Sequence, residues 1–275
     1  MTTLEDALAG LRLWPHHVDT LRSSVARFEA DPAVLAVILG GSLAPGFGGA
    51  GADIDIVVLV TPAEVARRSA TLELTHASAE LATYDGGYVD AKFVDLAFLR
   101  DVAQRGSDPA RWAFDGVRVL FSREPELAAV LESITRYPDA EHDERVRSFA
   151  AQLVAWRWFY REGTGKQNAY LQSTALHKLV LFACRLVLAH NRSLYPFHKW
   201  VLRVTEDAPE RPADLLEQIV ALLAAPSQER VDALVRSVLG HFGHDEAAVE
   251  RGWGTRFLLD TELTWQRGRP SVDEL

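Results

Sequence analysis

Two aspartates, Asp53 and Asp55, are the residues whose types and spacing point most directly to chemistry. They open the apolar run Ile54–Val60, whose Val and Ile content is typical of a buried strand. Residues two apart in a strand point to the same face, so the two carboxylates lie side by side. Such a pair repels unless a cation lies between them, and Mg²⁺ prefers oxygen ligands from carboxylates and substrate phosphates. The pattern therefore predicts a magnesium site.

A glycine-rich segment precedes the two aspartates. Gly40, Gly41 and Ser42 follow the apolar run Val34–Leu39, and ten residues separate Ser42 from Asp53. Because glycine has no Cβ, its backbone N–H can approach a phosphate closely, and Ser42 adds a hydroxyl donor. We expect Gly41 and Ser42 to form a phosphate site beside the aspartates.

Gly-Gly-Ser, a ten-residue spacer and Asp-x-Asp before an apolar run resemble the signature of the DNA polymerase β-like nucleotidyltransferases, which include antibiotic-modifying enzymes. The resemblance implies that Gly41 and Ser42 hold a nucleoside triphosphate, ATP in the first place. It also implies that Asp53 and Asp55 bind two Mg²⁺ ions. Ala52 stands where the family usually has Ser, which removes a hydroxyl but no metal ligand. The specific motifs cover only residues 40–92.

The same resemblance implies a third carboxylate on a neighbouring strand, which serves as metal ligand and base. Asp90 lies within the strand pattern of residues 88–94, whereas Asp95 precedes a helical pattern and suits an N-cap. We therefore assign Asp90 to the site. Lys92 shares the face of Asp90, where it either reaches a phosphate or remains a solvated lysine.

The elements expected around these residues form two domains. Hydrophobic periodicity predicts an N-terminal part with strands and helices and a C-terminal part with helices only. The resemblance implies the corresponding α+β fold, a nucleotidyltransferase domain with a mixed sheet flanked by helices over residues 1–138 and an all-α helical bundle over 139–275. The expected strands span 34–39, 54–60, 88–94 and 116–121, and the expected N-terminal helices span 4–29 with a break at Pro15, 61–80, 96–105 and 126–135. The C-terminal helices are expected at 143–162, 168–190, 197–206, 212–224, 227–240 and 245–265.

Two cations stand out on the apolar helix expected at 168–190. Lys178 and Arg185 are seven residues apart and so share one face. Basic groups on an apolar helix need a partner, which is either the triphosphate or an internal acid. Glu162 is an alternative general base to Asp90 or a solvated residue at a helix end.

Further residues leave two interpretations open. His198, Lys199 and Trp200 line an acceptor pocket or pack between helices. We interpret the histidines at 16–17 and at 241 and 244 as surface residues, because they lack further ligands at metal-site spacing.

The composition limits the compartment and the partners. The chain has 275 residues, 48% of them hydrophobic and 24% charged, a formal net charge of -9 and one cysteine, Cys184. A single cysteine excludes an internal disulfide framework, and the acidic charge argues against a large nucleic-acid partner. The N-terminus lacks the pattern of a signal peptide, and charges interrupt the apolar runs, so we expect a cytoplasmic protein without a membrane span.

The sequence as a whole favours a Mg²⁺-dependent nucleotidyltransferase. The expected reaction moves a nucleoside monophosphate, AMP in the first place, to a hydroxyl of a small molecule such as an aminoglycoside- or lincosamide-like antibiotic. The alternatives are a nucleotidyltransferase of antitoxin type that modifies a protein and a non-catalytic nucleotide-binding protein. The sequence does not determine the acceptor, the preferred nucleotide or the oligomeric state.

Overall fold

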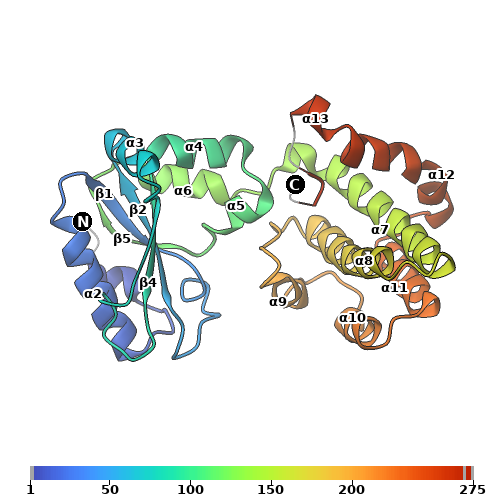
Figure 1. The fold of residues 1–275 in the computed structure, drawn as a ribbon, viewed down its shortest axis with the longest axis horizontal. Coiled ribbons are helices and arrows are strands. Elements are labelled where there is room, and N and C mark those ends of the chain that lie inside the picture. Colours follow the sequence, from blue (N-terminus) through green and yellow to red (C-terminus); the bar gives the residue numbers. More distant parts are fainter. Residues whose placement is uncertain (1–2, 269–270, 274–275) are drawn as a thin grey trace. The chain divides into compact units, whose positions relative to one another are not determined.

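The structure, a computed structural model, describes residues 3–268 and 271–273. The chain divides into two compact units (Figure 1). Met1–Gly106 and Ala110–Arg136 form the first unit, and Ser107–Pro109 and Tyr137–Leu275 form the second. The boundary expected after residue 138 lies close to this division, but the sequence did not indicate that residues 107–109 belong to the second unit.

The first unit contains a mixed five-stranded sheet in the order β3-β4-β2-β1-β5. Its strands are β1 (Val34–Leu39), β2 (Ile54–Val60), β3 (Thr75–Ser78), β4 (Val89–Val94) and β5 (Arg118–Ser122). β2 runs parallel to β4, and the remaining neighbours, β1–β2, β1–β5 and β3–β4, are antiparallel. Together with the flanking helices, this sheet confirms the expected α+β class.

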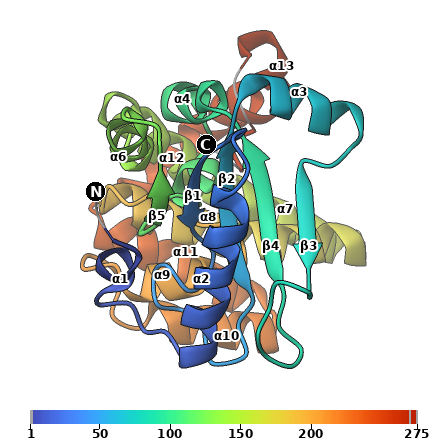
Figure 2. The ribbon, with the colours of Figure 1, turned by 90° about the vertical axis from the view of Figure 1, so that its left-hand side faces the viewer.

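Helices cover both faces of the sheet, and the alternation of β2 shows which side chains meet each layer. Ile54 and Ile56 belong to the apolar cluster that includes α1 (Leu4–Leu8) and α2 (Pro15–Glu29), and Figure 2 shows α2 lying along this face. Val57 and Leu59 belong to the opposite cluster, with α4 (Leu96–Arg105) and α6 (Leu127–Thr135). Because side chains alternate, Asp55 belongs to the α4–α6 face.

The prediction of one helix over 61–80 is wrong in its second half. Helix α3 (Pro62–Ala70) follows the N-cap Thr61, and residues 75–78 form the edge strand β3. Leu72 adopts a left-handed backbone with φ of 59°, which a continuing helix does not allow.

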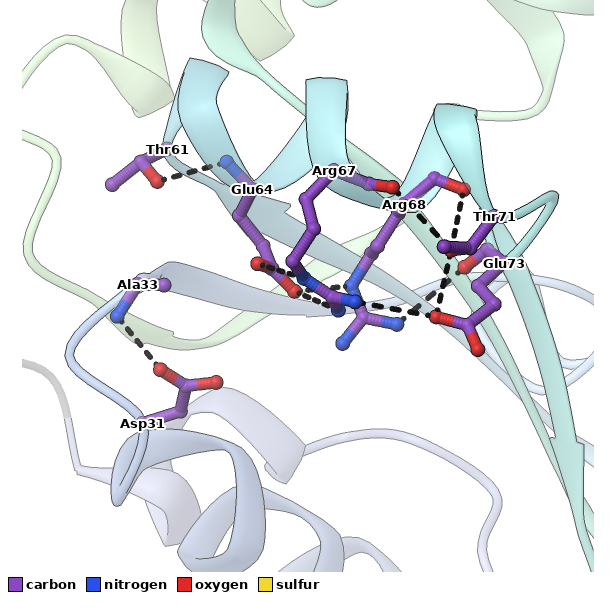
Figure 3. A network of polar contacts seen from close by, with 8 residues as sticks. All are labelled: Asp31, Ala33, Thr61, Glu64, Arg67, Arg68, Thr71 and Glu73. Carbon is purple, nitrogen blue, oxygen red and sulfur yellow. Dashed lines mark hydrogen bonds and ion pairs between the residues drawn. The ribbon is translucent and has the colours of Figure 1, made fainter.

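Polar contacts hold the turn after α3 (Figure 3). The guanidinium of Arg67 donates to Glu64 and to Glu73, and the Thr71 hydroxyl donates to Glu73 at 2.9 Å. The Arg67 hydrogen bonds hold the pKa of Glu64 at about 2. The carbonyl of Glu73 accepts from Arg68, whose guanidinium stacks over the Phe93 ring at 3.6 Å. These contacts end α3 and lead the chain into β3.

The described part of the second unit is helical, as expected. Its elements are η1 (Asp139–Glu141), α7 (His142–Gly165), α8 (Ala169–His190), α9 (Val201–Glu206), α10 (Leu215–Ala224), α11 (Gln228–His241), α12 (Glu246–Phe257), the π-helix η2 (Leu258–Glu262) and α13 (Thr264–Arg267). Helix α8 is the one described helix that is long and apolar enough to cross a membrane, and 67% of its most apolar window is buried within the fold. Such burial is typical of the core helix of a folded domain. The sequence analysis had expected no membrane-spanning helix.

A buried charge cluster lies inside the second unit. Asp108, at the start of α5 (Asp108–Trp112), accepts hydrogen bonds from Arg145 at 2.6 Å, Arg185 at 3.4 Å and the backbone N–H of Tyr195 at 3.3 Å. Arg185 is 1% exposed, and its guanidinium lies between the rings of Phe149 and Tyr195. Burial lowers the pKa of Arg185 to about 10, so it stays charged near neutral pH beside Asp108.

Candidate active site

Asp53, Asp55 and Asp90 lie at the beginning of the parallel strands β2 and β4. Asp55 and Asp90 are direct partners in the register of these strands. Asp53 immediately precedes β2 and, two residues before Asp55, points to the same face. All three residues are half-buried. The structure thus brings the three predicted carboxylates to one face of the sheet.

Tyr88 lies near these carboxylates. Its pKa is raised, first by a hydrogen bond to the Asp53 carboxylate, then by the charge of Asp53, with smaller contributions from burial and from the charges of Asp55 and Asp90. The residue is 41% exposed. One exposed phenol therefore feels the negative charge of all three aspartates.

Lys92 is the cation on this face of β4. Its Nζ lies 3.8 Å from Oδ2 of Asp90, and its side chain is 55% exposed. A lysine at this distance reduces the charge of Asp90 and retains donors for a second anion. The predicted phosphate contact and the solvated lysine both suit this position.

The glycine loop is built around Asp55. Gly41 has a left-handed backbone with φ of 60°, and a Cβ on this residue would lie 1.8 Å from Oδ2 of Asp55. The backbone N–H of Gly40 donates to the Asp55 carbonyl at 3.0 Å. Ser42 is buried, and its carbonyl accepts from the N–H groups of Phe47 and Gly48. Only glycine fits position 41, because any side chain would displace the Asp55 carboxylate.

The three aspartates fit Mg²⁺ in donor type and in strand position. They offer only oxygen donors, and they share one face of the sheet. As they lie, Asp53 faces Tyr88 and Asp90 faces Lys92. Within residues 3–268 and 271–273, no group of three or more His, Cys, Asp or Glu side chains converges closely enough to hold a metal ion.

Lys178 and Arg185, predicted to contact the triphosphate, both belong to α8 of the second unit. Lys178 forms an ion pair with the carboxylate of Asp273, and Arg185 donates to the Asp273 carbonyl at 2.7 Å as well as to Asp108. The internal partner that the sequence left open is therefore present for each cation. Their contact with a phosphate stays a prediction.

The remaining predicted residues divide by environment. Asp95 caps α4, accepting from the Phe98 N–H at 2.8 Å, which confirms its expected structural role. Glu162, the alternative base, pairs with Lys166 at 2.7 Å one helical turn away.

The residues proposed for an acceptor pocket contact aromatic side chains of their own segment. His198 shares a hydrogen bond of 3.0 Å with the Tyr195 hydroxyl, and Lys199 lies over the Trp200 ring at 5.1 Å. These contacts fit packing after α8, and the acceptor pocket stays a prediction.

Sequence reasoning missed the aromatic side chains behind the loop. The interpretation of His17 as a surface residue is wrong, because it is fully buried beside Tyr84, with ring centroids 5.4 Å apart. Tyr84 lies outside every element expected from the sequence, and Tyr88 is only the first residue of the strand expected at 88–94. The signal available was an aromatic on each side of a Gly-Gly pair, next to the strand that carries Asp90.

No family model matches this chain, and no curated protein is similar to it. Among solved structures, the chain is similar to a nucleotidyltransferase-like protein from Exiguobacterium sibiricum 255-15, at 15% sequence identity and a TM-score of 0.47. The similarity covers 91% of this chain and 80% of the other.

Proposed function

We propose that this chain is a nucleotidyltransferase that moves a nucleoside monophosphate, AMP in the first place, from a nucleoside triphosphate to a hydroxyl of a small molecule. One observation carries the proposal. Asp55 and Asp90 are partners on adjacent parallel strands, Asp53 precedes them on the same face, and Gly41 is in contact range of Asp55. Three carboxylates on one face of the sheet beside a glycine loop suit an enzyme that handles phosphates with divalent cations.

The residues have separate tasks in the proposed reaction. Asp53, Asp55 and Asp90 hold Mg²⁺, which when bound neutralises phosphate charge and increases the acidity of the acceptor hydroxyl. The loop at Gly41 and Ser42 orients the triphosphate, and Lys92 adds a positive charge beside it. Lys178 and Arg185 remain proposed phosphate contacts whose internal partners would first have to release them.

The proposed reaction exchanges one P–O bond at the α-phosphorus for another. The oxygen of the acceptor hydroxyl bonds to the α-phosphorus while the bond from that phosphorus to the bridging oxygen breaks. Pyrophosphate leaves, and the hydroxyl proton passes to the Asp90 carboxylate. Glu162 is the second candidate for this base, but its ion pair with Lys166 favours Asp90.

The proposed acceptor is a small hydroxylated molecule of the aminoglycoside or lincosamide type, and the proposed compartment is the cytoplasm. The acidic net charge of -9 suits a cationic acceptor better than a nucleic acid. An antitoxin-type enzyme with a protein acceptor is the second possibility within the same chemistry. A non-catalytic nucleotide-binding protein is favoured by one observation, that the described carboxylates do not converge as they lie.

A turnover assay tests the proposal. The purified chain is incubated with each of the four ribonucleoside triphosphates, MgCl₂ and a panel of hydroxylated acceptors, and mass spectrometry searches for an added nucleotide. We expect a mass increase that depends on Mg²⁺ and is lost in Asp55→Asn.

Asp95→Asn is the matched control, because this aspartate caps a helix outside the cluster. Pyrophosphate release only with an added protein extract would favour the protein acceptor. Triphosphate binding without any pyrophosphate release would favour the non-catalytic protein.

A further inference from the structure

The segment from Tyr84 to Tyr88 fixes the backbone on both sides of Asp53. The Tyr84 hydroxyl donates to the carbonyl of Ala52 at 2.5 Å, which belongs to the peptide group before Asp53. The carbonyl of Tyr88 accepts from the Ile54 N–H at 3.1 Å, which belongs to the peptide group after Asp53. Both peptide planes that define the direction of the Asp53 side chain are thus held by one short segment.

His16 holds the glycine-rich loop at Ala50, three residues before Asp53. Its Nε2 donates to the carbonyl of Ala50 at 2.8 Å, and its ring packs against the Tyr84 ring with centroids 4.5 Å apart. The hydroxyl of Thr83 donates to the carbonyl of His16 at 3.0 Å, and the N–H of Thr83 donates to the Thr20 hydroxyl. These bonds tie the start of α2 to the turn that carries Tyr84.

The absence of a side chain at Gly87 leaves room for the Tyr84 ring. A Cβ on Gly87 would lie 2.4 Å from ring atoms of Tyr84. Gly86 before it has a left-handed backbone with φ of 73°. The ring therefore folds over the Gly87 backbone, and this fold places its hydroxyl at Ala52.

We propose that Tyr84, supported by His16, is a positioning residue for Asp53. The inference rests on the proposed function, because it assigns Tyr84 the task of holding one ligand of the Mg²⁺ site. Asp53 lies at the end of a glycine-rich loop, where a free backbone would let its carboxylate move away from Asp55. Mutation of the hydrogen-bond partners of metal ligands changes metal affinity by about 10- to 100-fold in characterised sites. A backbone carbonyl held next to that ligand acts in the same way through its orientation.

The test replaces Tyr84 by Phe, which removes one hydroxyl and keeps the ring. Titration with Mn²⁺, followed by electron paramagnetic resonance, measures the dissociation constant of the metal alone. We expect Mn²⁺ binding to weaken about tenfold while the thermal unfolding midpoint changes little. The same variant should show faster hydrogen exchange at the amides of residues 52–54. Tyr170→Phe is the control, since Tyr170 is 82% exposed in the second unit.

A second pair of variants tests the supporting residue. Gln at position 16 can still donate to the Ala50 carbonyl, whereas Ala cannot. His16→Ala should weaken Mn²⁺ binding and speed exchange at residues 50–52, and His16→Gln should restore much of both. Equal effects of the two variants would mean that ring packing, and not the hydrogen bond, matters, which would remove His16 from the proposal.

The outcomes separate this inference from the proposed function. Unchanged Mn²⁺ affinity and unchanged exchange in Tyr84→Phe would overturn the positioning role, even if the wild-type chain is an active enzyme. If the wild-type chain binds no Mn²⁺, the metal site of the proposed function fails. Hydrogen exchange at residues 52–54 then decides alone whether Tyr84 positions Asp53. Faster exchange there supports the positioning of Asp53, and unchanged exchange refutes it.

Discussion

Two groups of charged residues in this chain differ in a way that indicates their roles. In the first unit, Asp53, Asp55 and Asp90 carry the same charge and share a half-exposed face. In the second unit, Asp108 is 2% exposed and receives hydrogen bonds from two arginines. The buried group is complete within the fold, whereas like charges gathered at the surface gain stability when a cation binds.

The buried group gives the largest expected loss of stability. Asp108→Asn keeps the shape but leaves Arg145 and Arg185 without their buried counter-charge, which should lower the free energy of unfolding by about 3–5 kcal/mol. Urea denaturation measures this change. Asp139→Asn is the matched control, because the Asp139 side chain is 71% exposed and its ion pair with Arg192 should be worth less than about 1 kcal/mol. Equal losses in the two variants would contradict the distinction drawn between the groups.

The surface group should behave in the opposite way. Asp55→Asn removes one negative charge from the cluster, so the free energy of unfolding of the metal-free chain should stay constant or rise slightly. Turnover should fall about 10²–10³-fold, since transition-state charge stabilisation by a metal is worth several kcal/mol. Urea denaturation and the nucleotide-transfer assay measure the two effects on the same preparation. A folded Asp55→Asn protein with near-normal turnover would sink the catalytic assignment.

His190 in the second unit extends the comparison, because its protonation makes the stability of the fold depend on pH. Burial first, and the neighbouring His244, His142 and His241 next, lower the pKa of His190 to about 4, and its Nε2 lies 3.0 Å from Nε2 of His244. The unfolded chain binds this proton below about pH 6.5 and the folded chain only near pH 4. The contribution of neutral His190 to the free energy of unfolding is therefore fully present above about pH 6.5. It decreases as the pH falls through this window.

The expected change in the free energy of unfolding is modest because His190 is only half-buried. We expect the free energy of unfolding to fall by about 1 kcal/mol between pH 7 and pH 5 from this residue. Urea denaturation at both pH values measures it, and His190→Phe should flatten the dependence. His241→Gln is the control, since His241 is exposed. An equally steep dependence in His190→Phe would assign the acid sensitivity to other groups.

Local pattern explains which elements the sequence predicted well. The helix expected at 96–105 and the strands expected at 34–39 and 54–60 match α4, β1 and β2, because apolar periodicity and caps are local signals. Strand β3 was missed because Thr75–Ser78 is exposed and lacks an apolar alternation. Its hydrogen bonds go to β4, and no local pattern indicates a partner on another segment.

The candidate site also divides into residues with a local sequence signal and residues whose partners come from distant segments. Strand alternation and the family resemblance were sufficient to select Asp53, Asp55 and Asp90 as neighbours. The partners of Lys178 and Arg185 were not predictable, because Asp273 and Asp108 are distant in sequence and meet them only through tertiary packing. The burial of His17 likewise depends on Tyr84 from another segment. Residues that act through backbone carbonyls, as proposed for Tyr84, carry no motif.

The smallest expected effect comes from Asp95, five residues after Asp90 and outside the carboxylate cluster. Asp90 is the partner of Asp55 in the strand register, whereas the Asp95 carboxylate accepts from the Phe98 N–H at the start of α4. Loss of an N-cap costs about 1 kcal/mol, so Asp95→Ala should lower the free energy of unfolding by that amount and leave the rate per folded molecule unchanged.

Asp90→Ala provides the contrast within the same segment. It removes a like charge from the cluster, so the metal-free chain should keep its stability while turnover is lost. Denaturation and turnover measured on both variants assign each aspartate to one of two roles, stabilising the fold or taking part in the reaction. An Asp95→Ala protein that loses turnover at full stability, beside an Asp90→Ala protein that keeps turnover, would exchange the two roles. The site would then have to be built around the beginning of α4, away from the paired strands.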